Sequence, residues 1–162
     1  MTGERSIELS AFKGSVFRIM YAHQKSRVCE PVSSPFGRFH YDAQFALYTS
    51  CTEEGAKVAM QRYLHEDDPD RIIVSLEINA DRVYDIRKTN DAGSASVVWQ
   101  DIVARGERSP TWEYSDAARE AGAQGMLYSS RSRPELAHLV LFDFSTDFVK
   151  HAGVYRAWKN DR

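Results

Sequence analysis

The chain has 162 residues and a formal net charge of −2 at pH 7. Hydrophobic residues make up 43% of it and aromatic residues 12%, a composition typical of one globular domain and not of a disordered chain. The slight acidity argues against broad binding to nucleic acid or anionic membranes, which usually requires a basic surplus, although it leaves room for a local basic pocket.

Short strands and helices are predicted in alternation along the chain. Residues 15–21 read as a first strand, and 34–50 as a turn that leads into a second. Residues 54–64 carry apolar side chains at helical spacing, with Thr52 and acidic residues at their start. The remaining predictions are strands over 71–78 and 82–87, a helix over 97–105 that buries Val98, Ile102 and Val103, a helix over 115–121 capped by Ser115, a strand opening at 126–128, a strand over 138–144, and loops over 65–71, 90–96 and 129–134.

No repeat, low-complexity tract or long linker divides the chain. We therefore predict a single α+β domain over residues 1–162, with short mixed β-sheets and flanking helices. Cys29 and Cys51 are the two cysteines and lack CxxC spacing, which favours a reducing compartment. No stretch resembles a secretory signal or approaches the ~20 apolar residues of a membrane span. The expected location is the cytoplasm, either of the producing cell or of a cell into which the protein is delivered.

The turn at 34–38 presents an arginine. Pro35 and Gly37 mark the turn, Arg38 lies at its exit, and the strand that follows carries Tyr48. A guanidinium stays charged at all working pH values and offers several donors in a fixed fork, so this pair suits a phosphate-bearing ligand. The alternative is an ordinary surface arginine that precedes a core strand.

Two further segments carry polar groups at strand ends. Arg18 lies inside an apolar strand, where a charge is costly without a partner. It therefore either pairs with an internal carboxylate or lines a cleft that binds an anionic ligand. Ser129 and Ser130 precede a basic loop that contains Arg131, and they either contact a bound sugar or phosphate or form a simple serine-rich turn.

Several common designs are missing from the sequence. The five histidines are dispersed and show no HxxxH or HxH spacing, so no metal site is expected. The glycines form neither a Walker loop nor a GxGxxG motif, and no GxSxG nucleophile elbow occurs. Cys29 lacks a local catalytic signature and is interpreted as structural.

The order of the remaining pieces resembles the RES-domain family of toxins, which consume NAD+. The matching pieces span about residues 15–145 and are 17–19, 36–40, 46–50, 83–87, 118–130 and 139–142. The resemblance implies an α+β fold related to ADP-ribosylating toxins, and cleavage of NAD+ at the nicotinamide–ribose bond that depletes cellular NAD. It also implies NAD+ as substrate with no separate cofactor, and a neutralising antitoxin or immunity protein as partner.

The resemblance also assigns roles to individual residues. Arg18 and Arg38 would grip the pyrophosphate, and Tyr48 would stack on or hydrogen-bond to the nicotinamide or its ribose. Ser130 matches the serine of the family's Tyr-x-Ser step, and Ser115 matches a second polar position sometimes assigned to the site.

One departure from the family affects the chemistry. The family's glutamate is expected about eleven residues after the strand tyrosine, where this chain has Ala59. A carboxylate there stabilises the ribosyl cation, and each ~1.36 kcal/mol of barrier changes the rate tenfold. Three explanations are open: Glu53 or Glu54 replaces the carboxylate, Gln61 acts as a weaker substitute, or the protein binds its ligand without efficient turnover.

Two alternatives to a glycohydrolase or phosphorylase follow from these observations. If the ribosyl acceptor is a protein side chain, the protein is an ADP-ribosyltransferase. If catalysis has been lost, Arg18, Arg38 and Arg131 form a nucleotide- or partner-binding cleft.

Overall fold

Six strands form one mixed β-sheet in the part of the chain that the structure, a computed structural model, describes. The described residues are 7–31, 34–61, 64, 67–87, 98–144 and 148–158. The strands are β1 (Leu9–Tyr21), β2 (Leu47–Ser50), β3 (Arg71–Asp85), β4 (Gly125–Ser129), β5 (Ala137–Leu141) and β6 (Val149–Trp158).

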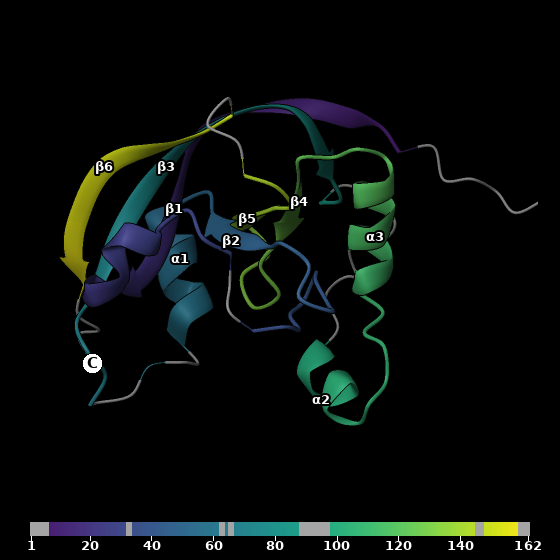
Figure 1. Ribbon diagram of the computed structural model, residues 1–162, viewed down its shortest axis with the longest axis horizontal. Helices are drawn as coiled ribbons and strands as arrows, with labels where there is room; N and C mark the ends of the chain where they lie inside the picture. Colours follow the sequence, from purple (N-terminus) through teal and green to yellow (C-terminus); the bar gives the residue numbers. More distant parts are fainter. Residues whose placement is uncertain are drawn as a thin grey trace, which may run out of the picture.

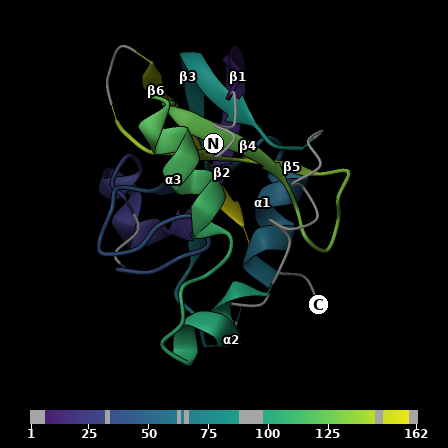
Figure 2. The ribbon, with the colours of Figure 1, turned by 90° about the vertical axis from the view of Figure 1, so that its right-hand side faces the viewer.

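Short helices are placed around this sheet. They are the 3-10 helix η1 (Ala22–Arg27) and the α-helices α1 (Glu53–Met60), α2 (Trp99–Ala104) and α3 (Trp112–Glu120). In Figure 1, α1 and α3 lie on either side of the short strands β2, β5 and β4, and Figure 2 shows the same arrangement from the side. Among the helices within the described residues, none has the length and apolar character needed to cross a membrane.

The sheet has a long half and a short half. The long strands β1, β3 and β6 run together as an arc (Figure 1), with β3 antiparallel to both of its long neighbours. The short strands continue from β1 through β2 and β5 to β4, which pairs in parallel with the end of β3. Because β1 pairs with both β2 and β3, these pairings close on themselves in a ring.

The short strands separate two apolar clusters. On β2, Leu47 packs with Leu139 and Leu141 of β5 in one cluster. Tyr48 and Val140 belong to the other, which α3 covers with Tyr114 and Ala118. This alternation is the period-2 pattern of a strand buried on both faces. It turns the Tyr48 face of β2 toward α3.

Several predicted strands are correct in place but wrong in length. The strands expected over 71–78 and 82–87 are one strand, β3, because Asn79 and Ala80 between them pair with β1 in spite of their low β-propensity. β1 begins at Leu9, earlier than expected, through the same pairing. β5 ends at Leu141, and β6 was not predicted. The short mixed sheets that the sequence predicts are therefore one closed sheet.

The helices confirm one capping prediction and correct another. The Thr52 side chain accepts a hydrogen bond from the backbone N of Gly55 at 3.0 Å, which confirms it as the N-cap of α1. The predicted cap Ser115 is wrong, because α3 begins at Trp112 and Ser115 lies inside it. The burial predicted for the 97–105 helix is also wrong, since α2 buries none of its residues and Val98 is 44% exposed. The loop predicted over 90–96 lies outside the described residues.

Candidate functional site

A cavity of about 660 Å³ opens between the short strands, α1, α2 and the loop at 34–40. Three arginines line it: Arg18, Arg38 and Arg131. Among the described residues that line it there is no Asp or Glu. A cavity of this size and charge suits an anionic ligand of cofactor size.

Four of the five predicted site residues meet at this cavity. Arg18, Arg38, Tyr48 and Ser130 all line it, although they come from separate parts of the chain. Ser115 does not line it. Ser115 is fully buried in α3, where its hydroxyl donates to the carbonyl of Trp112 at 3.1 Å, as a serine within a helix does.

Arg18 lies on β1 and is held by backbone carbonyls. Its Nη1 donates to the carbonyl oxygens of Val28 at 2.6 Å and Glu30 at 3.2 Å. No described carboxylate forms an ion pair with it, so the internal-carboxylate interpretation is wrong and the cleft interpretation is favoured. Burial lowers the pKa of Arg18, an effect that the Coulombic attraction of Cys29 and Glu30 partly offsets. An anionic ligand would relieve the cost of this buried cation.

Arg38 is held between aromatic rings. Its guanidinium carbon lies 5.0 Å from the ring centre of Phe39 and 4.9 Å from that of Tyr128. Its backbone carbonyl accepts a hydrogen bond from the hydroxyl of Thr111, just before α3. Arginine over aromatic faces keeps a planar fork of donors in one orientation. Both the side chain and the backbone of Arg38 are therefore fixed at the cavity wall.

The Tyr48 hydroxyl holds the loop that carries Arg38. It accepts a hydrogen bond from the backbone N of Phe39 at 2.9 Å and lies 2.8 Å from Nδ1 of His40. Nε2 of His40 lies 2.8 Å from the carbonyl of Ser34, which can only accept, so Nε2 carries the proton. In the neutral ring, Nδ1 then accepts from Tyr48. Burial lowers the pKa of His40 and raises that of Tyr48, so both groups stay neutral.

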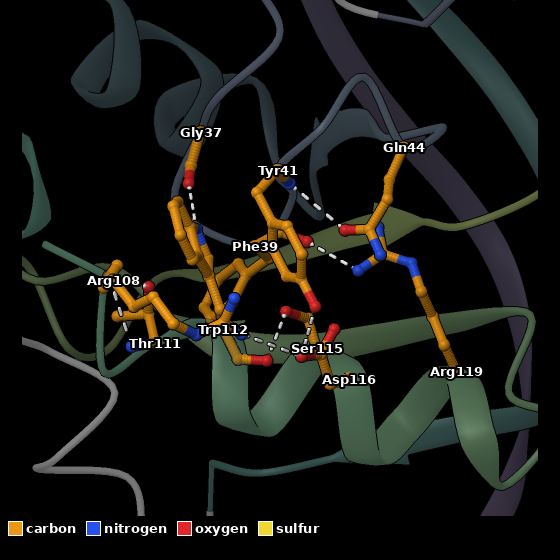
Figure 3. A network of polar contacts seen from close by, with 11 residues as sticks. Gly37, Phe39, Tyr41, Gln44, Arg108, Thr111, Trp112, Ser115, Asp116 and Arg119 are labelled. Atoms are coloured by element: carbon orange, nitrogen blue, oxygen red, sulfur yellow. Dashed lines mark hydrogen bonds and ion pairs between the residues drawn. The ribbon is translucent and has the colours of Figure 1, made fainter. Parts of the chain in front are cut away.

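Helix α3 fixes the same loop from its other side (Figure 3). Nε1 of Trp112 donates to the carbonyl of Gly37 at 2.8 Å. Arg119 donates to the carbonyls of Phe39 at 2.9 Å and Phe45 at 3.1 Å. The 34–45 loop is therefore bound to helix α3. Because the helix is a regular element, these bonds hold the loop and pre-organise Arg38.

Ser130 begins the loop after β4. Its Oγ accepts a hydrogen bond from the backbone N of Arg133 at 3.3 Å, which is the serine turn foreseen from composition. The hydroxyl proton remains available to donate toward the cavity, because Ser130 also lines it. The two interpretations of this serine are therefore compatible.

His138 is among the cavity residues that sequence reasoning did not single out. It lies on β5 opposite Ser50 of β2 and Tyr128 of β4, and its Nδ1 is 2.8 Å from Oγ of Ser50. Burial and the charge of Arg38 lower the pKa of His138 to about 4. No spacing rule points to this residue, because its partners are distant in the sequence. Within the described residues no cluster of His, Cys, Asp or Glu fits a metal ion.

Ala59 lies in the cavity wall, and none of the described carboxylates lines the cavity with it. Neither Glu53 nor Glu54 lines the cavity, and Glu54 lies 3.3 Å from Nη1 of Arg133 at the surface. Gln61 is also outside the lining. Neither substitute proposed from the sequence therefore lines the cavity, and binding without efficient turnover stays a prediction.

Comparisons of the sequence and of the fold with known proteins each found a match. The sequence model of the RES domain matches residues 15–160. The chain belongs to the RES domain family. Its fold is similar to that of the toxin chain in the crystal structure of the M. tuberculosis MbcT–MbcA toxin–antitoxin complex, with a TM-score of 0.60 and 13% sequence identity. The similarity covers 93% of this chain and 86% of the other. Among curated proteins, none matches significantly.

Proposed function

We propose that this RES-domain protein is a toxin that cleaves NAD+ at the bond between nicotinamide and ribose. The observation that carries the proposal is the cavity, which gathers Arg18, Arg38 and Arg131 with no described carboxylate in its lining. A dianionic pyrophosphate complements that charge, and the family membership supplies the substrate class. We also propose that the fold of this chain is related to that of ADP-ribosylating toxins.

The pyrophosphate is expected to bind at Arg38, with Arg18 contributing charge from β1. Arg38 is the better oriented of the two, because aromatic rings support its guanidinium. Nη1 of Arg18 is already engaged by carbonyls, so its contribution is mainly electrostatic. The Tyr48 ring faces the nicotinamide side, and its hydroxyl acts through the loop it holds.

Cleavage breaks the glycosidic bond of the pyridinium nucleotide. The electron pair moves to the ring nitrogen, neutral nicotinamide leaves, and a ribosyl cation remains. Water, phosphate or a protein side chain then adds and gives up a proton. The arginines disfavour the cation while the bound pyrophosphate favours it, so we expect slower turnover than a carboxylate would allow. A protein acceptor would make the same chemistry an ADP-ribosyl transfer.

An antitoxin is the expected partner. The similar structure is that of a toxin–antitoxin complex, and a protein that depletes NAD in its own cell needs to be neutralised. We extend that partnership to this chain as part of the proposal.

Controlled expression in a bacterial host tests the proposal. The wild-type protein is expected to arrest growth and lower the cellular NAD level, and Arg38→Ala is expected to relieve both effects. Arg105→Ala is the matched control, since Arg105 is an exposed arginine paired with Glu107 outside the cavity. Normal growth and NAD levels with wild-type protein at equal abundance would contradict it.

A non-catalytic binding module is the second candidate, and the absence of a carboxylate in the described lining favours it. On this reading the three arginines hold a nucleotide or a partner, and Ala59 marks lost catalysis. Nucleotide binding without any release of nicotinamide would select this function.

A further inference from the structure

His138 lines the cavity, and the reaction proposed above gives it no role. The residue is 6% exposed and lies in a row of facing side chains across three strands, with Ser50 on one side and Tyr128 on the other. Its ring centre lies 5.3 Å from that of Tyr128. The imidazole is therefore fixed in one orientation by its neighbours.

One ring nitrogen of His138 is open toward the cavity. Nδ1 bonds to Oγ of Ser50, whereas Nε2 has no hydrogen-bond partner among the described residues. Within the described chain, the buried side-chain polar atom without a partner is Nε of Arg71, so Nε2 of His138 is not sealed inside protein. Since His138 lines the cavity, Nε2 is accessible from it.

Among the described residues, the charged side chains that line the cavity are its three arginines. Its arginines can only donate, and both ring nitrogens of His40 are already engaged. The hydroxyls of a bound sugar need acceptors, because a buried unpaired polar group lowers affinity. The Ser50 hydroxyl can donate or accept, and in the tautomer that carries its proton on Nδ1 the His138 ring presents a lone pair at Nε2. Burial, and after it the charge of Arg38, lowers the pKa of His138, so this imidazole is neutral near pH 7.

The position of His138 indicates which sugar it faces. Its partner Ser50 lies two residues from Tyr48 on the same face of β2, and the Ser50 side chain adjoins Gly55 of α1. Tyr48 and Ser50 both line the cavity, and Tyr48 is the residue assigned above to the nicotinamide side. We propose that Nε2 of His138 accepts a hydrogen bond from a hydroxyl of the nicotinamide-side ribose, an inference that rests on the proposed function.

Calorimetric binding of two probes to the purified protein tests this assignment. ADP-ribose contains the ribose in question and ADP lacks it. His138→Ala is expected to weaken ADP-ribose binding about tenfold and to change ADP binding less than about twofold. His138→Gln, which restores an acceptor, is expected to recover part of the loss. His23→Ala, an exposed histidine stacked on Tyr21 outside the cavity, serves as control.

The assignment would be overturned if His138→Ala weakened the binding of ADP-ribose and ADP equally, or weakened neither. A loss of ADP-ribose affinity that His138→Gln does not recover would overturn it as well. Wild-type protein that binds neither probe would overturn the assignment and the proposed function together. If His138→Ala weakens binding of ADP-ribose and not of ADP, while wild-type protein releases no nicotinamide, cleavage alone is overturned and His138 remains a ribose contact.

Discussion

The hydroxyl of Tyr48 lies 2.8 Å from Nδ1 of His40, and this contact joins strand β2 to the loop that carries Arg38. The same hydroxyl accepts the backbone N–H of Phe39. The tyrosine therefore sets where the Arg38 guanidinium lies, in addition to forming part of the cavity wall. A residue assigned to direct ligand contact from the sequence has a structural role as well.

Tyr48→Phe should separate these two roles. The substitution keeps the ring but leaves Nδ1 of His40 and the N–H of Phe39 without their partner. We expect the free energy of unfolding to fall by about 1–3 kcal/mol and ADP-ribose affinity to fall with it. Urea denaturation and calorimetry measure the two effects. Unchanged stability would contradict the hydroxyl's role in holding the loop.

Gly37→Ala should disrupt the loop by crowding. A Cβ at this position would lie 2.2 Å from Cε1 of His40 and 2.9 Å from the hydroxyl of Tyr48, so the histidine ring has to move. Overpacking of this kind costs about 1–3 kcal/mol. We expect lower stability in urea together with a weaker response to ADP-ribose. Stability within about 0.5 kcal/mol of wild type would show that the ring relocates freely.

Local sequence signals were sufficient where structure depends on neighbouring residues. The N-cap at Thr52 and the turn at Gly37 could be predicted because their hydrogen bonds close within a few residues. The grouping of Arg18, Arg38, Tyr48 and Ser130 followed from family resemblance, and the cavity brings the four together.

Features that depend on distant pairing were missed. β6 contains a glycine and lacks clear alternation, and it forms by adding to the edge of β3. His138 acquires its environment from Ser50 and Tyr128 on two other strands. Ser115 was assigned to a helix start because the local pattern resembles a cap, whereas the helix begins three residues earlier. None of these facts is contained in a short window of sequence.

The stability of the protein should depend on His138 between pH 7 and pH 4. Its folded-state pKa of about 4 lies below its usual value, so the unfolded state binds the proton first as the pH falls. The free energy of unfolding therefore falls by up to roughly 3 kcal/mol between pH 6.5 and 4. His138→Gln, which does not titrate, should lose less stability over the same range in urea denaturation. Parallel losses in the two proteins would contradict the depressed pKa.

Ala59→Glu should restore the missing carboxylate. Ala59 is exposed on α1 and lines the cavity, so glutamate is accommodated without repacking. A carboxylate near the ribosyl cation should raise the rate of nicotinamide release by about tenfold or more. Gln61→Glu adds the same charge to the same region outside the cavity lining and should leave the rate near wild type. Equal rates for Ala59→Glu and wild type would indicate that the position does not face the reacting bond.

The most direct test is the release of free nicotinamide from NAD+ by purified protein. Wild type and Arg105→Ala should both release it, and Arg38→Ala should release at least about tenfold less, because the pyrophosphate loses its oriented guanidinium. No release by folded wild-type protein would contradict the proposed cleavage and leave a nucleotide-binding module. Equal release by all three would place the reaction away from Arg38.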